Sequence, residues 1–361
     1  MINKNLSLWG RLGIAVLASF WILNCAQNDN EAATISPDIV LAYTHLDDYS
    51  NYQLDWVEKT GSSFVAKTAQ LTLSASGLRS PTVVGDYLLL VDSSLTGRLL
   101  AYRRSDMSLQ GQIVVGSYPQ DMVVVNNIAY IANGATGTNL LKRVDVSALP
   151  NMSTLSDVTV GPQPSVVRYY NSRIYVGNQD WNSKTQATVS VVNPTTNTVD
   201  TSFDTGPNNM DIAYDGSRIW TVNVDWYNGS FVCQENASLT YAPTASYSPV
   251  DTITPSGAYA TNSGCAKTGL AFNSTGGFVA LRHSSGKFHL FSISGTTLNT
   301  TPVDATNSYR FVGNGANYLY KIHNGDGLTN TLTVLIEDLS GTQVGTVNLT
   351  KYNDMYFHVL K

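Results

Sequence analysis

The chain has 361 residues, with 21 Lys or Arg against 26 Asp or Glu, and a formal net charge of −5. An acidic chain lacks the basic surface that attracts nucleic acid, so we predict no nucleic-acid partner. Charged residues make up only 13% of the sequence, against about 25% in an average domain. Because helix surfaces are built mainly from Glu, Lys and Arg, this composition predicts an all-β protein, and a hydrophobic fraction of 43% excludes a disordered chain.

Residues 1–24 have the pattern of an export signal. Lys4 and Arg11 accompany an apolar run over residues 12–23, which is too short to span a bilayer as a helix. The run ends at Asn24 and Cys25 and turns polar at once, a sequence that resembles the lipobox of bacterial lipoproteins, in the relaxed form found in spirochaetes. This resemblance implies lipidation at Cys25, a flexible tether over residues 25–36, and anchoring to a bacterial outer membrane or cell surface. An ordinary secreted protein with a chance cysteine is the alternative.

An internal repeat of strand character runs through the rest of the chain. Its copies end 40 to 60 residues apart, and each consists of a polar turn, four or five strand-forming residues and a polar residue. The spacing, without helical periodicity, is typical of four-stranded propeller blades. The copies are Asp86–Asp92, Asn127–Asn133, Ser172–Asn178, Ser217–Asn223, Gly277–His283 and Asn317–His323, with a weaker one at Ile39–His45.

Each strong copy follows another short strand across a tight turn of Gly, Asn or Asp, the residues that hairpin turns require. Two more strands follow within a blade, for example over residues 188–192 and 198–203. The C-terminal residues 354–360 match the first strand of a blade, so we predict that they pair beside residues 39–45 and close the ring. The predicted domain is a seven-bladed β-propeller over residues 37–361, with six or eight blades as the alternative.

Three copies share a further pattern before their first strand. The segments Gly116–Gln120, Gly161–Ser165 and Gly206–Asn208 are followed by strands such as Arg173–Asn178. This pattern resembles the YVTN-type β-propeller repeat of bacterial proteins over about residues 80–270. The resemblance implies a propeller fold, but such propellers serve as surface proteins, binding modules and lactonase-like enzymes, so it does not select one function.

The loops that enter the first strand and leave the second strand of each blade are expected on one face, around the mouth of the central channel. A ring of polar residues there suggests a ligand site. The alternative is that these short side chains satisfy strand ends and loop amides. The candidates after the second strands are His45, Asp92, Asn133, Asn178, Asn223, His283 and His323, and those at the starts of first strands are Asp121, Asn209, Lys267, Arg310 and Asp354.

His45, His283 and His323 fall in neighbouring blades of the predicted ring. Facing sheets lie about 10 Å apart, whereas a zinc ligand lies about 2.1 Å from the metal, so we expect no shared metal and no cofactor.

Two loops on the same face repeat a dipeptide, Asp180-Trp181 and Asp225-Trp226. An exposed indole offers a flat platform to a sugar ring or a partner protein. The alternative is that each Trp packs over its own blade. The long segment over residues 224–269 holds Cys233 and Cys265, which we expect to form a disulfide in an exported protein.

The sequence contains no GxSxG motif and no carboxylate pair whose geometry points to hydrolysis. It therefore favours a monomeric, non-enzymatic module that binds a macromolecule or glycan at the channel mouth. A lactonase-like or other hydrolase with a site in the central channel is the alternative.

Overall fold

The computed structural model describes residues 40–45, 51–74, 77–179, 187–223, 237–253, 269–283, 287–315, 317–324, 331–350 and 355–359. The chain divides into two units, Met1–Thr34 and Ile35–Lys361, and the strands belong to the second. The predicted signal peptide, the tether and the three cysteines lie outside the described residues. No helix in the described part is long and apolar enough to cross a membrane.

The described strands form seven antiparallel sheets of four strands. Sheet 1 has the order β28 (Met355–Val359), β1 (Val40–His45), β2 (Asn51–Thr60) and β3 (Ser63–Ser74). The strands of the other six follow in chain order. Sheets 2 to 4 are β4 (Leu78–Val84), β5 (Tyr87–Asp92), β6 (Gly97–Arg103) and β7 (Leu109–Gly116); β8 (Pro119–Val125), β9 (Ile128–Asn133), β10 (Leu140–Asp145) and β11 (Ser153–Thr159); and β12 (Pro164–Tyr170), β13 (Arg173–Asn178), β14 (Thr188–Asn193) and β15 (Thr198–Asp204). Sheets 5 to 7 are β16 (Asn209–Tyr214), β17 (Arg218–Asn223), β18 (Ser238–Pro243) and β19 (Val250–Ile253); β20 (Leu270–Asn273), β21 (Gly276–Arg282), β22 (Phe288–Ser294) and β23 (Thr297–Leu298); and β24 (Tyr309–Asn314), β25 (Tyr318–His323), β26 (Thr331–Asp338) and β27 (Gln343–Thr350).

The C-terminal strand belongs to the first sheet. β28 pairs antiparallel with β1, from Val40 opposite Val359 to Thr44 opposite Met355. The predicted pairing of the two ends of the repeat region is therefore present.

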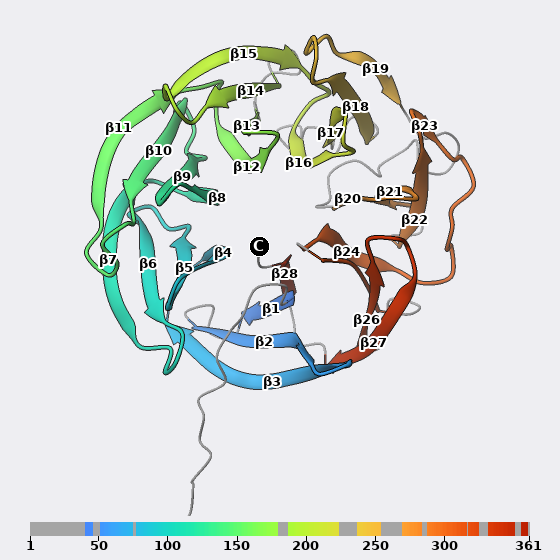
Figure 1. Ribbon diagram of the computed structural model, residues 1–361, viewed down its shortest axis with the longest axis horizontal. Coiled ribbons are helices and arrows are strands. Elements are labelled where there is room, and N and C mark those ends of the chain that lie inside the picture. The colour runs from blue at the N-terminus through green and yellow to red at the C-terminus, as the bar shows by residue number, and fades with distance from the viewer. Residues whose placement is uncertain are drawn as a thin grey trace, which may run out of the picture. The chain divides into compact units, whose positions relative to one another are not determined.

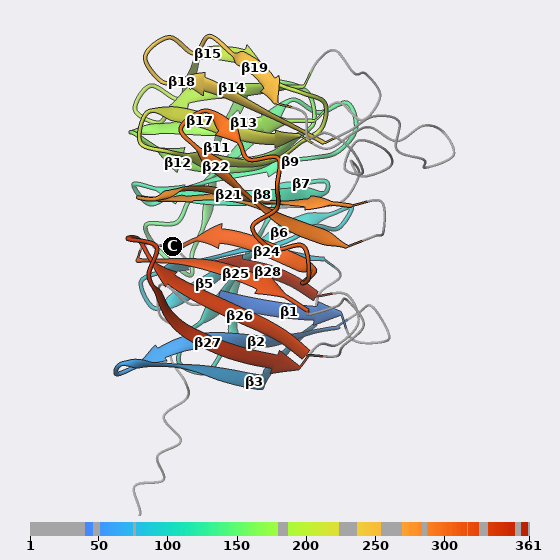
Figure 2. The same ribbon diagram turned by 90° about the vertical axis from the view of Figure 1, so that its right-hand side faces the viewer.

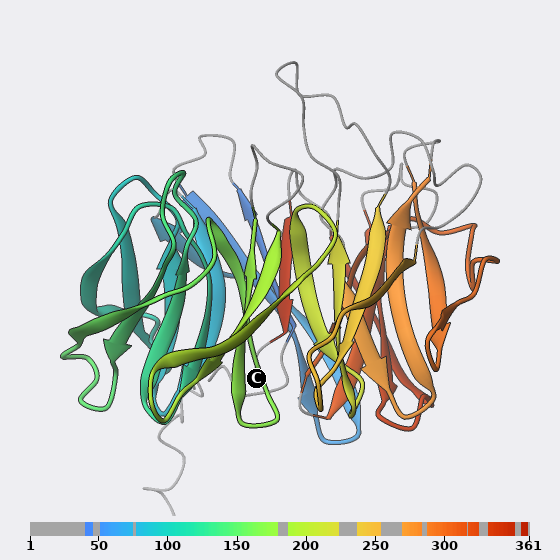
Figure 3. The ribbon, with the colours of Figure 1, turned by 90° about the horizontal axis from the view of Figure 1, so that it is seen from above.

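Within the second unit the sheets stand around a common centre, with β4, β8, β12, β16, β20, β24 and β28 nearest to it (Figure 1). The two side views show the strands of each sheet running between two opposite faces of this unit (Figures 2 and 3). Apolar clusters pack the facing surfaces of successive sheets against each other. Among the described residues, such a cluster joins each pair from sheets 2 and 3 to sheets 6 and 7, and another joins sheet 7 to sheet 1.

One aromatic residue recurs in the middle of the second strand. Tyr130, Tyr175, Trp220 and Tyr320 occupy the third position of β9, β13, β17 and β25, and all four are fully buried. A side chain of this size buries 150–250 Å², about the largest apolar contribution that one residue makes. The aromatic position of the repeat thus fills the space between sheets.

The repeated glycine and asparagine of sheets 2 to 5 contact each other. A Cβ on Gly116, Gly161 or Gly206 would lie 2.5, 2.5 and 2.9 Å from the side-chain nitrogen of the asparagine that ends the following second strand. Those asparagines are Asn133, Asn178 and Asn223. Only glycine leaves room for the amide at this close approach.

The predicted hairpin turns have the expected backbone. Asn126 and Asn127 have φ of 51° and 59°, and Asn171 and Ser172 have φ of 46° and 57°. Two successive positive φ values are the signature of the type I′ turn, whose twist matches that of antiparallel strands.

Candidate functional site

Five of the predicted mouth residues are buried at the ends of second strands, namely Asp92, Asn133, Asn178, Asn223 and His323. Asn178 Nδ2 donates to Thr188 Oγ1 and Ser190 Oγ, both at 3.0 Å, and Asn223 Nδ2 donates to Thr240 Oγ1 at 3.1 Å. Asp92 accepts from Arg98 Nη2 at 2.8 Å. The side chains of Asp92, Asn178 and Asn223 thus bond to the third strand of their own sheets.

The amide oxygens of the asparagines, in contrast, have no such partner among the described residues. The Oδ1 atoms of Asn133, Asn178 and Asn223 are buried and accept no hydrogen bond within the described residues. Asn209, at the start of β16, is fully buried, and neither amide atom is bonded there. The neighbouring Gln179 donates to the backbone oxygen of Asn209 at 2.9 Å. An unsatisfied buried polar group costs about 1–3 kcal/mol, so these amide atoms require partners that the described residues do not supply.

The described histidines do not converge. His283 stacks on His289 in sheet 6, with ring centres 4.8 Å apart. In sheet 7 the ring centre of His323 lies 5.3 Å from that of Tyr309, its partner on the adjacent strand. Burial lowers the pKa of both His289 and His323, and the nearby His283 lowers that of His289 further. Among the described residues, no group of three or more His, Cys, Asp or Glu side chains is placed to hold a metal ion.

Several predicted site residues cannot be placed. Asp180, Trp181, Asp225, Trp226, Lys267 and Asp354 lie outside the described residues, as do the side chains of His45 and Arg310.

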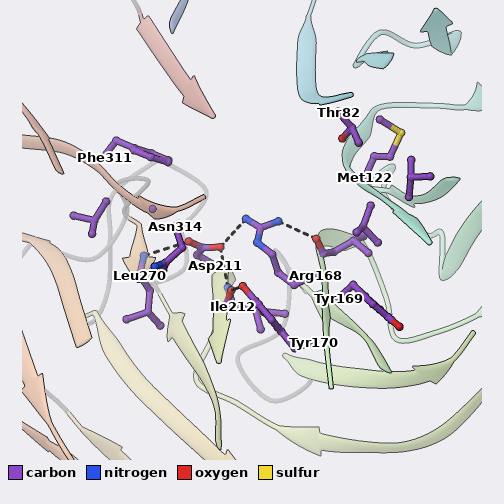
Figure 4. A pocket seen from close by; sticks show the side chains of 15 residues that line it. Thr82, Met122, Arg168, Tyr169, Tyr170, Asp211, Ile212, Leu270, Phe311 and Asn314 are labelled. Carbon is purple, nitrogen blue, oxygen red and sulfur yellow. Dashed lines mark hydrogen bonds and ion pairs between the residues drawn. The ribbon is translucent and has the colours of Figure 1, made fainter. Parts of the chain in front are cut away.

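A cavity of about 330 Å³ lies between the innermost strands of sheets 2 to 7 (Figure 4). Its wall includes Tyr170 and Asn314, which directly precede the hairpin turns of their sheets. Asn178 pairs with Pro164 at the opposite end of β12. The cavity therefore reaches the hairpin-turn end of the channel, and no predicted ligand residue whose side chain the structure describes lines it.

Arg168 lies in the wall of this cavity beside the carboxylate of Asp211 (Figure 4). Its Nη2 lies 2.7 Å from Asp211 Oδ1, and its Nη1 donates to Asp121 Oδ2. Burial alone disfavours the charged guanidinium, but the two carboxylates outweigh it and raise the pKa of Arg168. The guanidinium is therefore a permanent cation held from both sides.

The same two carboxylates also accept hydrogen bonds from neighbouring innermost strands. Asp121 on β8 accepts from Ser80 Oγ of β4 at 2.5 Å and from the Val167 amide of β12 at 3.0 Å. Asp211 on β16 accepts from the Leu270 amide of β20 at 3.2 Å. Because an innermost strand pairs on one side only, these side chains give its channel-side backbone groups partners.

A recurring β-bulge precedes this set of residues. The register shifts between Pro119 and Asp121 in β8, and at the corresponding places in β12, β16 and β24. Asp121 and Asp211 both follow the bulge, two copies apart, and Arg168 lies in the copy between them. The sequence analysis named Asp121 only as a residue at the start of a strand and did not identify Arg168 or Asp211. The signal in the sequence was that Asp121 and Asp211 occupy the same repeat position in the copies before and after the one that contains Arg168.

Comparisons with known proteins bear on the fold. No family model and no curated protein sequence matches the chain. A protein from Lactobacillus plantarum of solved structure is similar with a TM-score of 0.60 and 12% identity, over 90% of this chain and all of that one. The Pan2 WD40 domain of Neurospora crassa has a TM-score of 0.53 and 11% identity, over 84% of this chain and 90% of that one.

The hydrazine synthase of Kuenenia stuttgartiensis has a TM-score of 0.54 and 14% identity, over 73% of this chain and 77% of that one. Identities this low carry information on the fold alone. WD40 repeats form four-stranded propeller blades. Together with the four-stranded sheets around one centre, these likenesses identify the chain as a β-propeller protein.

Proposed function

We propose that the protein is a non-enzymatic binding module, in which a closed ring of seven blades recognises a macromolecule or glycan at the channel mouth. The pairing of β28 with β1 and the apolar contact of sheet 7 with sheet 1 support closure of the ring.

One observation carries the location of the binding surface. At the start of β16, beside Gln179, the buried amide of Asn209 has no hydrogen-bond partner among the described residues. Gln179 directly precedes the Asp180-Trp181 dipeptide, and Asn223 lies two residues before Asp225. Amides offer both a donor and an acceptor, and indoles offer a stacking surface, which is the combination that sugars and polar protein surfaces require.

The chemistry of the channel supports binding over hydrolysis. A general acid or base needs a carboxyl group that is free to exchange a proton with the substrate. Both oxygens of Asp121 are occupied, since Oδ1 accepts from Ser80 and the Met122 amide and Oδ2 from Val167 and Arg168. A lactonase-like or other hydrolase in the channel remains the competing proposal. Stoichiometric, tightly held calcium or zinc in the purified protein would favour it.

The test is a screen of the purified protein against glycans and extracellular-matrix proteins, followed by the double variant Trp181→Ala and Trp226→Ala. We expect at least tenfold weaker binding of any partner found, because buried aromatic anchors commonly contribute about 2 kcal/mol or more. Leu339→Ala, at an apolar residue that is 43% exposed after β26 on the opposite face, is the control and should retain affinity. Full affinity in the double variant would reject the surface.

We further propose that Cys25 carries a lipid that anchors the protein to a bacterial outer membrane or cell surface, and that Cys233 and Cys265 form a disulfide. Labelling of expressing cells with palmitate should be lost in Cys25→Ala, and retained labelling would reject the anchor. Non-reduced peptide mapping of exported protein that finds two free thiols would reject the disulfide.

A further inference from the structure

The channel cavity is a second place where this protein can hold a ligand, separate from the mouth. Its volume of about 330 Å³ lies at the small end of the range for ligand pockets, about 300–1,000 Å³. Liquid water takes about 30 Å³ per molecule, so the space equals roughly ten waters. A single six-membered sugar or polyol ring with its hydroxyl groups has a comparable size.

The charges beside the cavity select against ionic ligands. The two charged side chains that line the cavity, Arg168 and Asp211, form an ion pair with each other, 2.7 Å from Nη2 to Oδ1. An anion would compete with Asp211 for the guanidinium, and a cation would compete with Arg168 for the carboxylate. A neutral ligand meets neither penalty.

Arg168 and Asp211 keep unused hydrogen-bonding capacity. Arg168 has five N–H donors, and its bonds to Asp121, the Val167 carbonyl and Asp211 engage three of them. Its Nε–H and one Nη2–H have no acceptor among the described residues. Among the described residues, Asp211 Oδ2 accepts only the Leu270 amide, at 3.2 Å, and retains a second acceptor position.

A spare donor on Arg168 and a spare acceptor on Asp211 Oδ2 therefore lie close together, since Arg168 Nη2 and Asp211 Oδ1 of the same carboxylate are 2.7 Å apart. A hydroxyl group can accept from the guanidinium while it donates to the carboxylate, whereas a carbonyl can use only the first. Neighbouring hydroxyl groups on one ring can use both at once.

Most of the remaining wall is apolar, with Thr82 and Asn314 as polar members. Met122, Leu270 and Phe311 line the cavity, and Tyr169 contributes a ring that is 40% exposed (Figure 4). Such surfaces suit the C–H faces of a saturated ring. From these observations we infer that the channel cavity binds a neutral sugar or cyclic polyol, with Arg168 and Asp211 holding its hydroxyl groups.

The test uses the full chain and matched ring series: glucose with glucosamine and glucuronate, galactose with galactosamine and galacturonate, and inositol. Saturation-transfer NMR and thermal unfolding report binding, since a ligand of the folded state raises the melting temperature. We expect at least one neutral ring to bind at least tenfold more tightly than its charged partners. Binding of the acid or the amine as tightly as the neutral ring would overturn the inference, and so would the absence of binding by every neutral ring.

Variants locate the binding. Val124→Phe fills the cavity from β8 and should weaken binding at least tenfold, whereas Val114→Phe, on the 56% exposed position of β7, is the matched control and should not. Arg168→Lys keeps the positive charge between the carboxylates but lacks the Nε–H, and should also weaken binding. Should Val124→Phe or Arg168→Lys fail to fold, Tyr169→Ala serves instead, because this side chain is half exposed and should alter binding without loss of the fold.

Unchanged binding in the folded cavity variants would overturn the assignment to the channel. The Trp181→Ala and Trp226→Ala double variant should retain this ligand. Failure of the mouth proposal and failure of the channel inference are therefore distinguishable.

Discussion

Sheets 3 to 5 and sheets 6 and 7 solve the same structural problem with different chemistry. In sheets 3 to 5 the second strand ends in Asn133, Asn178 or Asn223, each in close approach to a glycine. At the equivalent positions sheets 6 and 7 have His283 and His323, which pack against the rings of His289 and Tyr309. An amide keeps its hydrogen-bonding pattern at every pH, whereas an imidazole changes charge near neutrality. The fold is therefore expected to respond to acid in one region and not in the other.

The largest expected effect tests what the two regions share. Tyr175→Ala in sheet 4 and Tyr320→Ala in sheet 7 each remove a fully buried ring at the same repeat position. Both should lower the free energy of unfolding by about 3–5 kcal/mol, through lost burial and the cavity left behind. Urea denaturation measures both. A much smaller loss in one of them would show that the aromatic position is not equivalent in the two regions.

A smaller effect is specific to the asparagine region. Gly161→Ala places a Cβ 2.5 Å from Asn178 Nδ2, so the amide must move away from Thr188 and Ser190. We expect a loss of about 1–3 kcal/mol in the free energy of unfolding, typical of overpacking. The added change Asn178→Ala gives the methyl group room, so the double variant should lose less than the sum of the single variants. Strict additivity would contradict the proposed contact.

The histidine region should make stability depend on pH. Since burial lowers the pKa of His289 and His323 below the ordinary value of 6.5, the unfolded chain takes up protons first as the pH falls. Their contribution to the free energy of unfolding is constant above about pH 7.5, falls as the pH drops through 6.5, and levels off below the folded pKa values.

His289→Gln and His323→Asn should therefore flatten the profile of melting temperature between pH 7.5 and 5. Asn178→Ser, in the other region, is the control and should leave the slope unchanged. A slope that survives both histidine changes would assign the acid response to other groups.

The smallest effect concerns an ion pair between the second strand and the outermost strand of sheet 4, in the asparagine region. Arg173 Nε lies 2.9 Å from Asp200 Oδ2, and both side chains are 35% exposed. Solvent screens such a pair, so Asp200→Asn should change the free energy of unfolding by at most about 0.5 kcal/mol, and less in high salt. A loss above about 1 kcal/mol would mean that this ion pair contributes more to the region than its exposure indicates.

Much of the fold could be predicted because its signals are local. Strand positions follow from alternation and β-branched or aromatic residues, and turns such as Asn126-Asn127 require positive φ whatever surrounds them. The repeat also predicted the pairing of β28 with β1, since the C-terminal segment reads as a first strand with no partner of its own.

The candidate site was predicted only in part. Asn133, Asn178 and Asn223 were correctly expected at strand ends, but their burial depends on close approach by glycines that lie 17 residues earlier in each case. Whether they or the Asp-Trp loops bind a ligand is still a prediction.

By itself the sequence determined which residues form strands, where the chain turns and how often the unit recurs, because these depend on a few neighbouring residues. Only the tertiary structure decided that Asp121, Arg168 and Asp211 meet beside a cavity. These residues are 47 and 43 positions apart, on strands that share no backbone ladder. A bulge sets where each side chain leaves its strand, and the arrangement of sheets around one centre brings the three together. Distances between separate sheets depend on the packing of all the residues between them, which no local pattern encodes.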